Sequence, residues 1–192
     1  MISVVVTGVG GGGLGEQVVK ALTLPGVGPY DVAVCDVTWE SVGLLDAPGA
    51  AYTIPMANDP AYLATVQAVC AAVGAEFLIP GSEPEIKRLS QDDARHALAR
   101  VGVTVLIQPA TVLDVCFNKA ETMARIEGLR EVAEGSSLPP LPRVPKTRRI
   151  SSIGALDYAL DYLRFVFPLI IKPSVGGGGS NGVFLAQTYA EA

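Results

Sequence analysis

The chain has 192 residues, a formal net charge of −5 and a sequence pI near 4.9. This acidic balance argues against general attraction to nucleic acid or to anionic membranes, so any anion that the chain binds must be met by local groups. With 49% hydrophobic and 17% charged residues, the composition is typical of a globular protein with one large or two small domains, which excludes a disordered tail.

The N-terminal part of the chain alternates strand and helix patterns. Residues 2–7 form an apolar, β-branched run, and a glycine-rich turn separates them from a helical pattern at 14–23. A second buried strand is predicted at 31–36 and a short third one at 51–55. The order is therefore strand, glycine turn, helix, strand, strand.

The same alternation continues through the next fifty residues. A helix is predicted to begin at Asp59, as its N-cap, and to reach about Gly74. Strand patterns at 77–80 and 103–107 flank a charge-rich helix at about 84–101. This succession predicts an α/β domain over 1–110, with a Rossmann-like parallel sheet covered by helices on both faces.

The pattern changes after residue 110. The expected elements are two helices, a proline-rich basic connector, a capped amphipathic helix and two strands, at 110–116, 119–128, 131–149, 151–165, 169–172 and 183–187. We expect 111–192 to be the start of a second, α+β domain that this chain does not complete.

The first glycine run matches a dinucleotide-binding fingerprint. Gly10, Gly12 and Gly15 have the G-x-G-x-x-G spacing between a strand and a helix, and Asp36 ends the next strand. Taken alone, this context favours NAD, although glycines also allow tight strand-to-helix packing in any such sheet. Neither glycine run of the chain ends in Gly-Lys-Ser/Thr, which excludes a P-loop.

The second glycine run follows a lysine in an apolar strand. Strand periodicity places Lys172 on the same face as Ile170, toward the ten-residue connection 173–182. Such a loop is rich in backbone N–H donors and can fold over a polyphosphate while the lysine supplies charge. The alternative, a hairpin tip with a surface lysine, leaves a cation in an apolar strand unexplained.

The segment FPLIIKPSVGGGGSNGV, residues 167–183, resembles the phosphate-binding strand and loop of the ATP-grasp superfamily, close to the large-subunit type of carbamoyl-phosphate synthase. The resemblance extends upstream through VVVTGVGGGGLGEQVV, DPAYLATVQAV, FLIPGSEPEI and VCFNKAETM, in the order of a preATP-grasp domain followed by the start of an ATP-grasp domain. One departure is Asn118, which stands where the family usually has aspartate, although it still suits a helix N-cap.

The resemblance implies an ATP site. Lys172 would contact the α and β phosphates, Lys119 would add a second charge, and a run of small residues would cover the triphosphate. That run consists of Gly176, Gly177, Gly178, Gly179, Ser180 and Gly182.

The resemblance also implies that the N-terminal sheet binds the second substrate rather than NAD. We expect Gly10, Gly12, Glu16 and Glu83 to bind an amine or an amino acid at the carboxyl ends of the strands. The simpler reading of both glutamates is that acidic residues in a first helical turn stabilise the helix dipole.

The implied function is that of an ATP-dependent ligase, in which a carboxylate attacks the γ-phosphate of Mg-ATP and an amine captures the acylphosphate. No residue of this chain is expected to be a catalytic group or a metal ligand, because the family places its acidic Mg²⁺ ligands beyond the position of Ala192. The chain alone is expected to be inactive. The alternatives are a non-catalytic Rossmann-like NAD-binding module and one subunit of a split enzyme that pairs with a complementary half or forms a homo-oligomer.

The remaining reactive side chains favour no other chemistry. The three cysteines, Cys35, Cys70 and Cys116, are far apart and the only histidine is His96, which argues against a disulfide framework or a zinc site and favours a reducing compartment. The N-terminus lacks the pattern of a signal peptide and no apolar run has spanning length, so a cytoplasmic location is expected.

Overall fold

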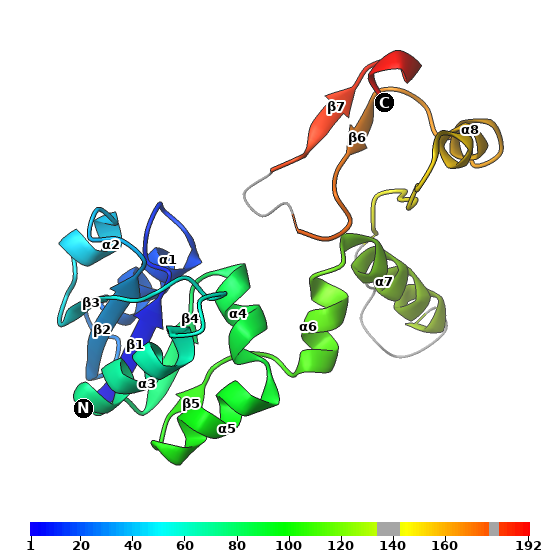
Figure 1. Cartoon of the computed structure of the whole chain (residues 1–192). Coiled ribbons are helices and arrows are strands. Elements are labelled where there is room, and N and C mark those ends of the chain that lie inside the picture. Colours follow the sequence, from blue (N-terminus) through cyan, green and yellow to red (C-terminus); the bar gives the residue numbers. More distant parts are fainter. Residues whose placement is uncertain (134–142, 177–180) are drawn as a thin grey trace. The chain divides into compact units, whose positions relative to one another are not determined.

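The structure is a computed structural model that describes residues 1–133, 143–176 and 181–192. The chain divides into two units, Met1–Ala110 and Thr111–Ala192, which we call unit 1 and unit 2. Figure 1 shows the strands and helices of each unit along the chain.

Unit 1 is built on a five-stranded parallel sheet with the strand order β3-β2-β1-β4-β5. Its strands are β1 (Ile2–Thr7), β2 (Tyr30–Asp36), β3 (Ala51–Thr53), β4 (Phe77–Pro80) and β5 (Thr104–Val105). The apolar run at the N-terminus becomes the central strand, where Val4 pairs with Val32 on one side and with Phe77 on the other. The predicted α/β class with a Rossmann-like parallel sheet is therefore confirmed.

Alternation along the strands divides the core of unit 1 into two layers. The helices are α1 (Leu14–Leu22), α2 (Val42–Leu45), α3 (Tyr62–Ala72), α4 (Glu83–Leu89) and α5 (Asp92–Arg100). Val4 and Val6 pack in one cluster with apolar residues of α1 and α2, whereas Val5 packs in a second cluster with residues of α3, α4 and α5. Helices thus cover both faces of the sheet (Figure 1).

The single helix predicted at 84–101 is wrong, because the chain forms α4 and α5 with a break between them. The break lies at Ser90 and Gln91, where the Ser90 hydroxyl donates to the backbone oxygen of Lys87 and Gln91 adopts an extended conformation. Arg88 and Asp93 form an ion pair across the break, at 2.8 Å. The high charge content of residues 84–101 was therefore not sufficient evidence for one continuous helix.

Three further boundaries in unit 1 differ from the predicted ones. Asp59 does not cap the third helix, since its carboxylate accepts a hydrogen bond from Ala61 in a turn and the helix begins at Tyr62. The strands predicted at 51–55 and 103–107 are shorter, because only Ala51–Thr53 and Thr104–Val105 join the sheet. Both short strands lie at the edges of the sheet.

Unit 2 contains three helices and a pair of antiparallel strands among the residues that the structure describes. They are α6 (Ala110–Cys116, which begins one residue before the unit), α7 (Lys119–Ala133), α8 (Ile153–Asp161), β6 (Leu169–Ile171) and β7 (Phe184–Ala186), followed by a 3-10 turn at Tyr189–Glu191. Helix α7 is longer than predicted. Helix α8 is shorter, because the chain leaves the helix and reaches a positive φ of 53° at Arg164.

Within the described parts of the chain, none of the helices combines the length and the apolar character that crossing a bilayer requires.

Candidate functional site

In unit 2 the beginning of α7 is joined to the segment that leads into the glycine loop. The Lys119 amide donates to the Ser174 carbonyl at 2.8 Å, and the Lys119 ammonium donates to the Gly176 carbonyl at 2.5 Å. Asn118 and Val175 form an isolated antiparallel bridge between these contacts. Asn118 and Lys119 thus contact three successive residues, Ser174, Val175 and Gly176, which lie far from them in the sequence.

Asn118 acts as the N-cap that the sequence predicts. Its side-chain oxygen accepts a hydrogen bond from the amide of Glu121 at 3.2 Å. The hydroxyl of Thr122 donates to the carbonyls of Val115 and Asn118, at 2.7 and 3.0 Å. These contacts fix the turn between α6 and α7 and thereby the position from which Lys119 extends.

Lys172 follows β6 directly and is exposed. Within the described residues its ammonium has neither a hydrogen bond nor an ion pair, so nothing in that part of the chain neutralises its charge. Gly176 and Gly182 have positive φ values of 73° and 71°, which glycine adopts without strain. A Cβ at Gly182 would lie 2.9 Å from a side-chain carbon of Pro173, so the two ends of the loop are in contact.

Four residues of the predicted ATP site, Gly177, Gly178, Gly179 and Ser180, lie outside the described residues. The structure brings Lys119 to Gly176, at the start of the glycine loop, and keeps Lys172 exposed. The assignment of these residues to a nucleotide stays a prediction.

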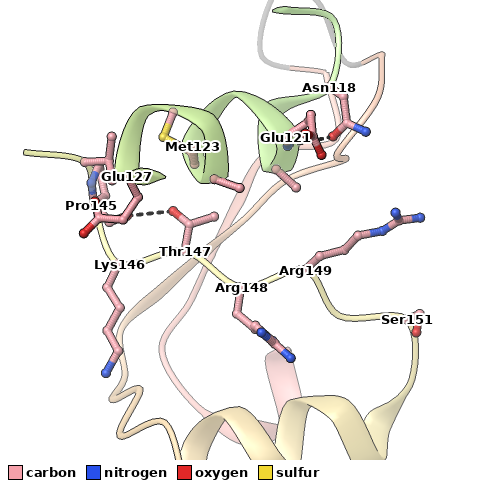
Figure 2. Close-up of a pocket in the computed structure, with 13 residues that line it drawn as sticks. Asn118, Glu121, Met123, Glu127, Pro145, Lys146, Thr147, Arg148, Arg149 and Ser151 are labelled. Atoms are coloured by element: carbon pink, nitrogen blue, oxygen red, sulfur yellow. Dashed lines mark hydrogen bonds between the residues drawn. The ribbon is translucent and has the colours of Figure 1, made fainter. Parts of the chain in front are cut away.

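A groove of about 810 Å³ runs along α7 in unit 2. One wall is formed by Asn118 and α7, including Glu121 and Glu127, and the other by residues 144–149 and Ser151. Figure 2 shows this segment passing beneath the helix.

Unit 1 contains a cavity of about 710 Å³ at the carboxyl ends of its strands, where ligands of open α/β sheets bind. Gly10 belongs to the glycine turn that lines it, and its amide donates to Asp36 Oδ2 at 2.6 Å. Asp36 Oδ1 accepts a second bond, from the amide of Val37 at 2.7 Å. Asp36 is therefore more than the end of a strand, because its carboxylate fixes the glycine turn.

A buried glutamate forms another wall of the same cavity. Glu85 is only 6% exposed; its Oε2 accepts from the Ser82 hydroxyl at 2.7 Å and its Oε1 from the Tyr62 hydroxyl at 3.1 Å. The Thr7 hydroxyl is close to this group, but it makes no hydrogen bond of normal geometry within the described residues.

The electrostatics of Glu85 follow from its burial. Burial raises the pKa of its carboxyl, and the nearby charge of Asp36 adds to this rise, while the hydrogen bonds from Ser82 and Tyr62 and the nearby Thr7 hydroxyl oppose it. Burial and the Glu85 charge likewise raise the pKa of Tyr62. Among the described residues that line the cavity there is no lysine, arginine or histidine.

The two glutamates predicted to bind an amine make surface ion pairs instead of facing this cavity. Glu16 pairs with Lys20 at 2.5 Å, which lowers the pKa of Glu16, and Glu83 pairs with Lys87 at 2.6 Å. Neither is among the cavity-lining residues, and Gly12 is not either, whereas Gly10 is. The role of all four in substrate binding stays a prediction.

Sequence reasoning missed Glu85, although two signals pointed to it. Ser82 and Glu85 have the spacing of a capping box, and Glu85 lies one turn before the fully buried Leu89 on the same helix face. The helix face shared with Leu89 therefore distinguishes the buried Glu85 from Glu83, which lies on another face.

No sequence profile of a known protein family matches the chain, and no curated protein sequence does either. Solved biotin carboxylase domains resemble it in structure. The biotin carboxylase domain dimer of the Hydrogenobacter thermophilus 2-oxoglutarate carboxylase, solved with MgADP, ADP and bicarbonate, gives a TM-score of 0.55 at 18% identity, over 98% of this chain and 38% of that one.

Two other solved structures have lower scores. The biotin carboxylase domain of a single-chain bacterial carboxylase gives a TM-score of 0.47 at 19% identity, over 85% of this chain and 34% of that one. The biotin carboxylase subunit of a pyruvate carboxylase gives 0.42 at 18% identity, over 100% of this chain and 39% of that one. The likeness to the 2-oxoglutarate carboxylase domain establishes a shared fold, and this chain spans 38% of that domain's length.

Proposed function

We propose that this chain is part of an ATP-dependent ligase of the ATP-grasp type and that unit 2 binds the triphosphate of the nucleotide. The observation that carries the proposal is the contact of Lys119 with Gly176, which brings a second lysine to the glycine segment that follows Lys172. The fold shared with an ADP-bound biotin carboxylase domain supports it.

The residues present suit a phosphate chain. Lysines act as point charges for phosphate oxygens, and glycines in left-handed conformations expose backbone N–H groups that act as neutral donors. Phosphoryl transfer depends chiefly on positioning and on neutralising developing charge, which is what two lysines and a glycine loop supply. Lys172 is suited to this role because no described group competes for its charge.

Magnesium would accompany ATP and would supply positive charge that neutralises its phosphates. In residues 1–133, 143–176 and 181–192, no three side chains of the metal-ligating types converge, so the described residues do not form a site for the ion.

The unit 1 cavity is our proposed site for the second substrate. Asp36 and Glu85 contribute two carboxyl groups and Ser41 and Ser82 two hydroxyls, without a basic side chain among the described lining residues. This lining favours an amine or another hydrogen-bond donor over an anion. In the proposed reaction a carboxylate oxygen attacks the γ-phosphorus of ATP and ADP leaves, which gives an acylphosphate. The amine nitrogen then attacks the acyl carbon, loses a proton and displaces inorganic phosphate. The dimeric state of the 2-oxoglutarate carboxylase domain also makes a homo-oligomer our expectation.

A second candidate function is a non-catalytic NAD-binding module. It is favoured by the glycine turn at Gly10, which is positioned by the acidic residue that ends β2. It is disfavoured because the single N–H of Gly10 is already bonded to Asp36 and is not available to a pyrophosphate.

Thermal unfolding in the presence of ATP or NAD separates the two functions. A ligand that binds the native state raises stability by RT ln(1 + [L]/Kd), about 2.7 kcal/mol at a hundredfold excess over Kd. We expect ATP to raise the melting temperature and Lys172→Gln to abolish most of that rise. The matched control is Lys20→Gln, which removes one exposed lysine from unit 1. Stabilisation by NAD alone, or an equal ATP response in Lys172→Gln and wild type, would overturn the proposal.

A further inference from the structure

Positive charge is concentrated in one segment of this acidic chain. Residues 135–156 contain no aspartate or glutamate, and the described part of that stretch carries four basic residues, Arg143, Lys146, Arg148 and Arg149. Within this segment, residues 144–149 and Ser151 form one wall of the groove along α7. Because the net charge of the chain is −5, long-range attraction does not bring anions to it. Binding an anion therefore requires a local cluster of positive charge such as this one.

Lys146 has a structural role that accounts for its charge. Its ammonium donates to the carbonyl oxygens of Leu163 and Arg164, which follow α8, and lies 4.8 Å from the centre of the Phe165 ring. A cation at the end of a helix stabilises the exposed carbonyl groups there. Figure 2 shows the Lys146 side chain directed away from α7.

Arg148 and Arg149 are adjacent, and both are exposed. In the described residues neither makes a hydrogen bond or an ion pair. Figure 2 shows that they point to opposite sides of the segment: Arg148 toward the helix below it, and Arg149 toward the end of α7 that carries Asn118 and Glu121. Only Arg149 therefore directs its guanidinium along the groove toward the start of α7.

The acidic residues of the groove do not neutralise Arg149. Glu127 is paired with Arg130 at 3.0 Å. Glu121 lines the groove as well, but among the described residues no ion pair joins it to Arg149. An arginine with a planar fork of donors, placed at a groove and left without a protein acceptor, is suited to bidentate contact with a phosphate or a carboxylate.

We propose that the groove between α7 and residues 144–149 is a binding site for a small oxyanion group, a phosphate or a carboxylate, and that Arg149 is the residue that holds it. This site is separate from the roles proposed for Lys119 and Lys172. It requires no nucleotide.

The neighbouring arginine provides the control. Arg149→Gln and Arg148→Gln change the net charge equally, and neither removes buried packing. The full chain would be titrated with pyrophosphate and, separately, with malonate, at constant ionic strength adjusted with NaCl, and binding would be followed by calorimetry and by thermal unfolding.

We expect one of the two anions to bind the wild type and Arg148→Gln alike, and to bind Arg149→Gln at least about tenfold more weakly, because a charged hydrogen-bonding partner is lost. Preference for pyrophosphate or for malonate identifies the anion as phosphate or carboxylate. Glu121→Gln is expected to tighten binding, since it removes a negative charge from the groove.

An equal loss of anion affinity in Arg148→Gln and Arg149→Gln, or no saturable binding of either anion by the wild type, would overturn the proposal. An ATP response that depends on Lys172 but not on Arg149 would leave the proposed nucleotide site intact, so the two proposals can fail independently.

Discussion

Lys119 donates a hydrogen bond of 2.5 Å from its ammonium to the carbonyl of Gly176, a residue 57 positions later in the chain. The Lys119 amide binds Ser174 at the same place. One residue therefore fixes both the start of α7 and the start of the glycine loop. A bound phosphate would compete with the Gly176 carbonyl for the same ammonium.

Replacing Lys119 by glutamine is expected to weaken ATP binding by about tenfold or more, because a charged hydrogen-bonding group is typically worth about 1.5–3 kcal/mol. The backbone bond to Ser174 remains, so α7 is expected to keep its position. Calorimetric titration measures the affinity for ATP, and amide hydrogen exchange at Gly176 measures whether the start of the glycine loop opens more often in the variant. Lys20→Gln is the control, and an unchanged ATP affinity in Lys119→Gln would contradict the assignment.

The third glycine of the N-terminal motif is required for close packing. A Cβ at Gly15 would lie 2.4 Å from the Gly8 carbonyl oxygen and 2.7 Å from that of Thr7, and backbone atoms cannot yield as a flexible side chain can. We expect Gly15→Ala to lower the free energy of unfolding by about 1–3 kcal/mol. Urea denaturation measures the change.

Gly128→Ala provides the matched substitution for Gly15→Ala. It also places alanine in a helix, but a Cβ there meets no atom within 4 Å. Alanine is expected to stabilise α7 by about 0.5–1 kcal/mol at this position. Changes of the same sign in both variants would show that helix propensity, not close approach, governs position 15.

Tyr62 is fully buried and donates to Glu85. Removing its hydroxyl in Tyr62→Phe leaves a buried carboxyl oxygen with one donor fewer, which we expect to cost about 1–3 kcal/mol of unfolding free energy. Tyr162→Phe is the comparison, since Tyr162 is 74% exposed and its ring stacks on Tyr158 without help from the hydroxyl. Equal urea midpoints for the two variants would contradict a structural role for the Tyr62 hydroxyl.

The fold of unit 1 was predictable because its strands have strong local signals. The run at Ile2–Thr7 is apolar and β-branched on both faces, as a central parallel strand requires, and the structure places it in the middle of the sheet. The break between α4 and α5 was not predictable in this way, since Ser90 and Gln91 include neither glycine nor proline and the break depends on local hydrogen bonding and an ion pair.

The candidate sites show the same division between local and distant information. Asn118 was recognisable as an N-cap from its position before a helical pattern. The contact of Lys119 with Gly176 depends on how separate segments pack, which no local pattern encodes. Choosing Glu85 over Glu83 needed the helix face to be anchored by a buried neighbour, Leu89, rather than the position of the acid in the first turn.

Glu85 predicts a specific dependence of stability on pH. Burial raises the pKa of its carboxyl from the ordinary value of 4.5, so the native protein keeps this proton to higher pH than the unfolded chain does. The free energy of unfolding therefore falls as pH rises above about 4.5, by at most about 1.4 kcal/mol per pH unit for one proton. Glu85→Gln cannot titrate and is expected to lack this decline.

Glu83→Gln is the control, because it removes the same type of side chain from the solvent-facing position two residues earlier, and it is expected to retain the decline. Urea denaturation between pH 4.5 and pH 8 compares the three proteins. Tyr62 stays neutral over this range because its pKa is raised as well, which leaves Asp36 as the charged neighbour. If Glu83→Gln and Glu85→Gln show the same slope, the decline does not arise from the buried carboxyl.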